Sequence, residues 1–135
     1  MKLGSKLMKR LSLYVFLVLM FCNNAFADIK PIYFGYLKYP DGKEYRMISK
    51  FRINDNYSVW GNYEWYEKEK KYEGVFFRGK LEGNVLKIFW TDKFGEGWLK
   101  IKFDEKFITF DGEWGVIKDN FELKKEGDWT GSALR

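Results

Sequence analysis

Within residues 98–104, apolar and charged side chains alternate strictly from Leu99 onward, and this period of two constrains the fold more than any other feature of the chain. The apolar residues Leu99, Ile101 and Phe103 share one face, and two lysines and an aspartate alternate with them. Such a period is typical of a β-strand with one buried and one solvated face. Residues 107–114 repeat the pattern after a tight connection at Glu105-Lys106, with four residues in phase: Ile108, Phe110, Gly112 and Trp114.

The composition extends this conclusion to the chain after residue 27. Ala133 is the only alanine there, although alanine is the best helix former. Only four of the 6 Trp, 9 Tyr and 13 Phe lie earlier, and aromatic residues favour the surface of a sheet. Turn signals such as Pro40-Asp41-Gly42 and Gly83-Asn84 recur along the chain. The sequence therefore predicts an all-β fold of about eight strands, near 31–39, 44–53, 57–66, 72–79, 84–91, 97–104, 107–116 and 120–125.

Short connections between the predicted strands favour a single antiparallel meander with almost no helix. An eight-stranded meander can remove its own edges by closing into a small up-and-down β-barrel. A barrel of this size is either packed solid or holds one small ligand. The charged outward face of residues 98–104 argues against a barrel that spans a membrane, which needs an apolar outer band.

Residues 1–27 predict a secretory signal peptide. They contain four basic residues and no acidic one, then an apolar run from Leu11 to Cys22, and they end in Ala25-Phe26-Ala27. This is the order that export and cleavage require. The alternative is an uncleaved anchor, but a membrane-spanning helix needs about 20 apolar residues and this run is shorter. We expect a periplasmic or secreted protein in which residues 28–135 form one domain without a membrane span.

The charge of the chain belongs largely to this first segment. The formal net charge of +5 falls to about +1 when the four basic residues before residue 28 are removed. No nucleic-acid partner is therefore expected. The single cysteine, Cys22, also lies in the segment, so the predicted domain holds no disulfide. The chain has no histidine, which excludes histidine-dependent nucleophilic catalysis and histidine-ligated metals.

The remaining candidates for chemistry are carboxylates, and each has a simpler explanation. Asp111 and Glu113 lie two residues apart on one face, a spacing that two catalytic carboxylates could use. They also lie on the solvated face beside Lys100 and Lys102, where cross-strand pairing explains them. The segment 92–96 offers oxygen atoms to a cation, but it reads more simply as a turn. We expect neither an enzyme, nor a cofactor, nor a metal site.

Glycine and aromatic residues recur together from Gly74 to Gly115. Examples are Tyr72-Glu73-Gly74-Val75, Phe89-Trp90 and Phe110-Asp111-Gly112-Glu113-Trp114-Gly115. This theme resembles that of small exported bacterial barrel proteins with Gly/Trp repeats, and the strand pattern is similar to avidin-type and lipocalin-type barrels. The resemblance covers about a third of the chain and implies the meander fold, but it carries over no ligand residue.

Aromatic residues in the inward phase suggest a calyx-type module that binds a small apolar or amphipathic ligand. The predicted lining residues are Tyr63, Trp65, Trp90, Phe103, Phe110 and Trp114. For each of them ordinary core packing is the competing explanation.

Other aromatic residues fall in the outward phase of strands that should be solvated on that side. The outward residues with this property include Trp60, Tyr66 and Phe89. Three explanations stay open: a homodimer or a covering tail that carries Trp129, a surface for a sugar or protein partner, and the mouth of a ligand cavity. The alternative function is therefore an envelope-associated structural or interaction protein.

Overall fold

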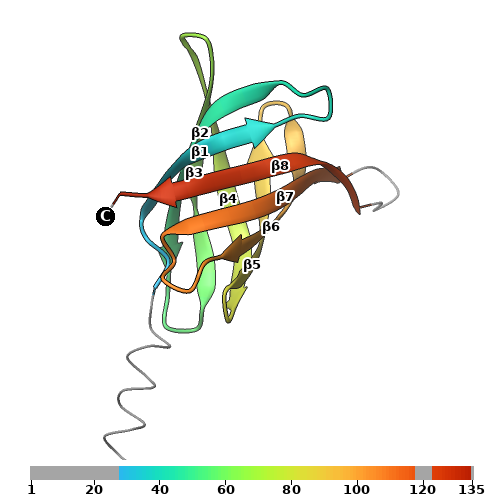
Figure 1. Ribbon diagram of the computed structural model, residues 1–135. Helices are drawn as coiled ribbons and strands as arrows, with labels where there is room; N and C mark the ends of the chain where they lie inside the picture. The colour runs from blue at the N-terminus through green and yellow to red at the C-terminus, as the bar shows by residue number, and fades with distance from the viewer. Residues whose placement is uncertain (1–27, 118–122, 135) are drawn as a thin grey trace, which may run out of the picture.

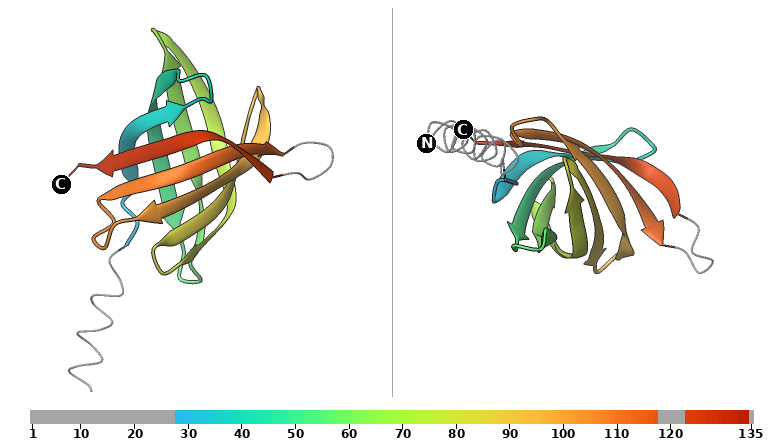
Figure 2. Two further views of the ribbon diagram at one scale, coloured as in Figure 1. Left: turned by 45° about the vertical axis from the view of Figure 1, so that its right-hand side comes forward. Right: turned by 90° about the horizontal axis from the view of Figure 1, so that it is seen from below.

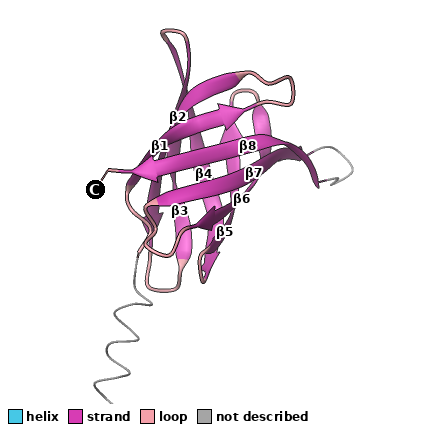
Figure 3. Cartoon of the chain, in the orientation of Figure 1, coloured by secondary structure: helices cyan, strands magenta, loops and turns pink. Residues whose placement is uncertain are grey.

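The computed structural model describes residues 28–117 and 123–134, and these residues form strands joined by turns without any helix (Figure 3). The all-β prediction is confirmed. The eight strands are β1 (Ile32–Lys38), β2 (Glu44–Ile53), β3 (Ser58–Glu67), β4 (Lys70–Glu82), β5 (Val85–Asp92), β6 (Gly95–Phe103), β7 (Thr109–Ile117) and β8 (Leu123–Ala133).

Every strand pairs antiparallel with its neighbours in the chain, and β8 returns to pair with β1. Tyr33 lies opposite Ala133, and Lys38 lies opposite Asp128. Figures 1 and 2 show the first and last strands side by side on the wall of the barrel. The meander therefore closes into an up-and-down barrel, as predicted, and no strand is left with a free edge.

Alternate residues of every strand fill the interior. The most deeply buried large side chains come from all around the wall: Trp129, Tyr33, Tyr63, Phe76, Phe103, Met47, Leu86, Ile88, Leu99 and Ile101. Their rings meet mainly edge to face or tilted, as for Tyr33 and Phe110, whose centroids are 5.2 Å apart. This geometry is favourable for aromatic rings beyond the area they bury.

Glycines give these rings room on the neighbouring strand. Several glycines lie directly opposite large inward aromatic residues, for example Gly74 opposite Tyr63, Gly97 opposite Trp90, and Gly127 opposite Trp114. A β-carbon added at Gly74 would overlap the Tyr63 ring, and one at Gly97 would overlap both Trp90 and the backbone of Gly115. The recurrence of glycine with aromatic residues thus follows from packing, because a broad ring lies across the backbone of the next strand.

The prediction for the last strand is wrong in its position. It was expected near 120–125, but β8 runs from Leu123 to Ala133, and Trp129 is an inward residue that is 2% exposed. Trp129 is therefore part of the core and not of a covering tail. Its indole nitrogen donates a hydrogen bond to the Ser49 hydroxyl at 2.9 Å. This bond explains why a serine interrupts the apolar inward face of β2.

Two turns also differ from the prediction. Residue 107, and not 108, points inward before β7, because the turn between β6 and β7 spans more than Glu105-Lys106 and brings Phe107 into the core. Tyr57 was placed on the inward face of the third strand, but it lies in the preceding turn with a φ of 61° and is exposed.

Strand β4 is longer than the predicted 72–79. A register shift lies between Phe77 and Lys80, where Arg78 has a φ of 51°. This bulge lets Phe76 and Leu81 both face the core although they are five residues apart. The predicted signal peptide, residues 1–27, lies outside the described residues.

Candidate functional site

One end of the barrel has a small cavity walled almost entirely by aromatic rings. Its volume is about 40 Å³. We call its lining residues the aromatic cage: Leu37, Tyr39, Tyr63, Trp65, Trp90, Asp92, Phe94, Trp114 and Trp129. Asp92 is the only charged residue among them.

The cage forms where the odd-numbered strands end and the turns that follow them begin. Trp65 comes from the end of β3, Trp90 from β5 and Trp114 from β7, so period-two alternation turns all three inward at the same end. The rings of Trp90 and Trp114 are 6.0 Å apart between centroids, and Trp65 stacks on Tyr72 at 4.3 Å. Each ring is thus held by a second ring.

Three of the four indole N–H groups of the cage, those of Trp90, Trp114 and Trp129, are bonded to the protein itself. Trp90 Nε1 donates to the carbonyl oxygen of Trp98 at 3.1 Å, and Trp114 Nε1 donates to that of Lys38 at 3.1 Å. The indole N–H of Trp129 likewise donates a hydrogen bond to the Ser49 hydroxyl. The three indoles therefore offer the cavity carbon and π-electron surface, and not hydrogen-bond donors.

Asp92 is the main polar feature of the cage. Its Oδ2 accepts a hydrogen bond from the Tyr63 hydroxyl at 2.8 Å, and its Oδ1 accepts one from the backbone N–H of Phe94 at 2.8 Å. No lysine or arginine of the described residues forms an ion pair with it. Each carboxylate oxygen can accept a further hydrogen bond, so Asp92 retains capacity for a donor.

Burial and the charge of Asp92 both raise the pKa values of tyrosines at this end. Burial, followed by the charge of Asp92, raises the pKa of the Tyr63 hydroxyl far above its usual range. Burial raises the pKa of Tyr39 to about 12, and the charges of Asp92, Asp41 and Glu67 contribute to the increase. Burial disfavours a charge of either sign here, and the charge of Asp92 makes a negative one less favourable than a positive one.

Phe94 covers the cavity from the turn between β5 and β6, and it is 61% exposed. Its ring also borders a second hollow of about 210 Å³, lined by Lys71, Tyr72, Glu73, Asp92, Lys93 and Phe94. Phe94 and Asp92 belong to both linings, so they lie between the cavity and the outer hollow.

The six predicted lining residues are all buried, but they separate into two groups. Four of them line the cage: Tyr63, Trp65, Trp90 and Trp114. Phe103 and Phe110 lie at the opposite end, where Phe103 packs against Tyr33 at 5.6 Å and Phe107 at 5.0 Å. We call that region the closed end.

Sequence reasoning missed five members of the cage. Trp129 was missed because β8 was placed too early, and Asp92 was assigned to a turn. Phe94 and Tyr39 lie in or beside turns, where the alternation rule does not reach, and Leu37 is an ordinary inward residue of β1. An acidic residue at the end of an aromatic strand was the available signal for Asp92.

The three predicted outward residues do face outward, in different surroundings. Trp60 is 43% exposed. The Arg46 guanidinium lies 4.7 Å from the Tyr66 ring centroid, and the Tyr66 hydroxyl donates to Glu64. Phe89 stacks on Phe77, with the centroids 5.9 Å apart.

A shallow apolar hollow of about 360 Å³ lies beside Phe89 and Trp98 on the outside of β5 and β6. The indole nitrogen of Trp98 is buried there without a hydrogen-bond partner among the described residues. The sequence reasoning overlooked exposed apolar residues on β1, namely Ile32, Phe34 and Tyr36.

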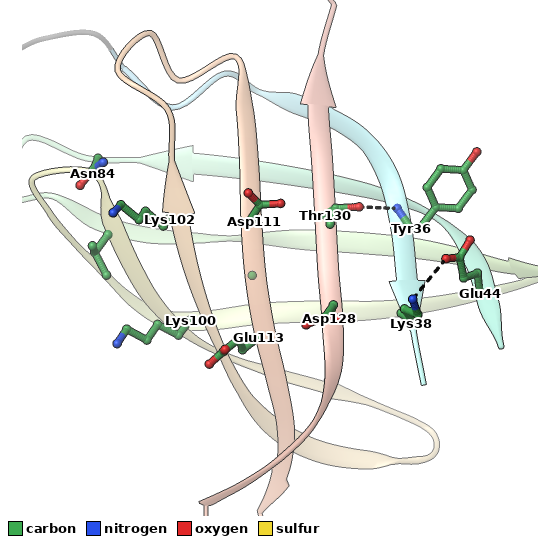
Figure 4. A pocket seen from close by; sticks show the side chains of 12 residues that line it. Tyr36, Lys38, Glu44, Asn84, Lys100, Lys102, Asp111, Glu113, Asp128 and Thr130 are labelled. Carbon is green, nitrogen blue, oxygen red and sulfur yellow. Dashed lines mark hydrogen bonds and ion pairs between the residues drawn. The ribbon is translucent and has the colours of Figure 1, made fainter. Parts of the chain in front are cut away.

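A hollow of about 900 Å³ lies on the outer face across β5, β6, β7, β8 and β1 (Figure 4). Opposite charges face one another across its strands: Lys102 lies opposite Asp111, and Lys100 opposite Glu113. This register places both carboxylates beside lysines on the outer face, and Glu113 forms its ion pair with Lys125 of β8 at 3.3 Å. All four side chains of these cross-strand pairs are exposed, and an exposed ion pair such as that of Lys125 with Glu113 contributes little stability.

No group of three acidic or cysteine side chains that could hold a metal ion occurs in the described part of the chain. Among residues 28–117 and 123–134 no helix has the length and hydropathy to cross a membrane. Comparisons of the chain with protein families, with curated proteins and with solved structures found no match.

Proposed function

We propose that this chain is an exported, non-catalytic binding protein whose aromatic cage takes a small amphipathic ligand. The observation that carries the proposal is the convergence of seven aromatic side chains and one carboxylate on a cavity at one end of the barrel. Ligand sites are typically concave and apolar, with a few placed polar groups. The outer hollow, in contrast, is lined mostly by charged side chains of the solvated face and by no cluster of aromatic rings.

The contrast between the two ends of the barrel supports this placement. The closed end buries its aromatic residues without leaving them a polar group to share with a ligand, since the Tyr33 hydroxyl donates to the Phe107 carbonyl oxygen at 2.6 Å. At the cage, Asp92 retains free acceptor capacity and Phe94 is an exposed cover. A ligand head of small size fits this combination of apolar wall, single charge and displaceable ring.

The test is mass spectrometry under non-denaturing conditions on protein recovered from its export compartment. We expect a small-molecule mass on the monomer of the unmodified chain and of the outward variant Trp60→Ser, and its loss in the cage variant Trp65→Ala. A bare monomer, or an added mass that survives Trp65→Ala, would overturn the proposal. A denatured spectrum of the same sample tests the predicted cleavage after Ala27.

The second candidate is an envelope-associated interaction protein, and the apolar hollow beside Phe89 and Trp98 favours it. Exposed apolar surface of this kind suits a partner that covers it. In that case the same spectra contain a dimer or a co-purified protein. A variant with both Trp60→Ser and Phe89→Ser then loses the partner, whereas Trp65→Ala keeps it.

A further inference from the structure

The chemistry of the cage selects the kind of ligand head that it can hold. We propose that the aromatic cage binds a small organic cation, an ammonium or methylated ammonium head, between its rings and the Asp92 carboxylate. This inference rests on the proposed function and names its ligand class.

The ring faces provide the first part of the argument. Aromatic faces carry negative charge density and attract cations that approach the ring, most strongly where water is excluded. Trp65, Trp90 and Trp114 are all at most 6% exposed. Because the indole N–H groups of Trp90 and Trp114 are bonded to backbone carbonyls, these two side chains present π surface to the cavity.

The carboxylate provides the second part. Asp92 contributes the only formal charge in the lining, and no described side chain neutralises it in an ion pair. It already accepts from Tyr63 and from Phe94, and a cationic head would supply the counter-charge that it lacks. An anionic head would meet the same carboxylate and the negative ring faces, and it would find no lysine or arginine in the lining.

The rim of the cage shows the same preference in the protein's own side chains. The Lys93 ammonium lies 4.7 Å from the Tyr72 ring centroid and 5.0 Å from that of Phe94. The Lys70 ammonium lies 5.3 Å from the Tyr72 centroid. Tyr72 stacks in turn on Trp65, so ammonium groups already occupy the outer side of the ring cluster that walls the cavity.

The volumes of the cavity and of the outer hollow indicate how a larger ligand head could enter the cage. The cavity of about 40 Å³ has room for a small head only, and Phe94 separates it from the hollow of about 210 Å³ outside. Outward rotation of the exposed Phe94 ring joins the two spaces. A ligand then places its cation beside Asp92 and its remaining atoms along Tyr72 and Glu73.

The experiment compares choline with 3,3-dimethylbutan-1-ol, a neutral molecule of the same shape, by tryptophan fluorescence and calorimetry. We expect choline to bind at least about tenfold more tightly than the alcohol, because only the cation is attracted by its charge to the ring faces and the carboxylate. Asp92→Asn, which keeps an acceptor for Tyr63, should remove most of that difference. Glu113→Gln removes a carboxylate from the outer face of β7 and should leave the difference unchanged.

Equal or tighter binding of the alcohol would overturn the cation inference and leave the proposed function standing. Failure of both probes to bind would also overturn the inference, while the mass spectra of the recovered protein test the proposed function independently. The ratio of the two affinities is measured on the unmodified chain, so an Asp92→Asn protein that does not fold leaves the test intact. Phosphatidylcholine vesicles present the same head on a lipid, and binding to choline but not to vesicles assigns a free cation.

Discussion

Aromatic residues line both ends of this barrel, and the two ends differ in what the rings enclose. At the closed end Tyr33, Phe103 and Phe110 contact one another with centroids 5.2–5.6 Å apart, and the single hydroxyl is bonded within the protein. At the cage the rings leave a cavity of about 40 Å³ and enclose a carboxylate. Aromatic content alone therefore does not distinguish a core from a site. The space and the unneutralised charge distinguish them.

The largest expected effect is on stability and separates the two ends directly. Phe103→Ala should lower the free energy of unfolding by about 3–5 kcal/mol, because the residue is 1% exposed and no solvent can fill the gap. Trp65→Ala should cost less, at most about 3 kcal/mol, because its site adjoins an existing cavity. Denaturant unfolding of both variants measures the difference.

Ligand binding should reverse that order. The Phe103→Ala protein, assayed where it is folded, should retain the mass adduct or choline affinity, since Phe103 lies outside the cage. Trp65→Ala should lose it. Equal loss of binding in both variants would show that the ends act as one core, and the comparison would fail.

The next expected effect is on stability and tests a feature that both ends share, namely glycines that make room for aromatic rings. Gly74→Ala should destabilise the barrel by about 1–3 kcal/mol, because the added methyl group overlaps the Tyr63 ring. Gly131→Ala should do the same at the closed end, where the β-carbon overlaps Phe110. Denaturant unfolding measures both variants.

A double-mutant cycle supplies the control. In a Tyr63→Val background the cost of Gly74→Ala should largely disappear, since the ring that it overlaps is gone. An unchanged cost would mean that the glycine is needed for its backbone alone, and the packing rule would not hold at the cage.

The inward phase of the strands could be predicted from the sequence because alternation is a local property of each strand. It placed Trp65, Trp90 and Phe103 correctly inside. Position along the barrel axis was not predicted, because it depends on the register between strands and on the bulges that shift it, as at Arg78 in β4. Phe103 and Trp65 therefore look alike in sequence although they lie at opposite ends.

Residues in turns were the hardest to predict. Asp92 and Phe94 join the cage because the turn after β5 folds back over the cavity, and the Phe94 N–H bonded to Asp92 fixes that turn. A short turn with an aspartate is common on any sheet, so its composition alone does not distinguish a site from a connection. For a different reason, Trp129 was not predicted to face inward. Gly127 and Gly131 interrupt the apolar pattern of β8, because both positions must accommodate rings from β7.

The smallest expected effect concerns two tyrosines whose pKa values are both raised by burial but differ in the charges that act on them. Burial raises the pKa of both Tyr33 and Tyr39 to about 12, but only Tyr39 also responds to Asp92. Asp92→Asn should therefore lower the pKa of Tyr39 and leave that of Tyr33 unchanged. Residue-resolved NMR titration of carbon-13-labelled tyrosine rings measures both.

The same titration fixes the alkaline limit of the fold. A phenol with a raised pKa is favoured in its neutral form by the folded state, so its contribution to stability is fully present below pH 10.0, the ordinary tyrosine value, and is lost as the pH rises through about 12. In Asp92→Asn the part due to Tyr39 should be lost at lower pH, whereas the part due to Tyr33 should not move. If the two tyrosines shift together, Asp92 acts on the whole barrel, and the electrostatic distinction between its ends is wrong.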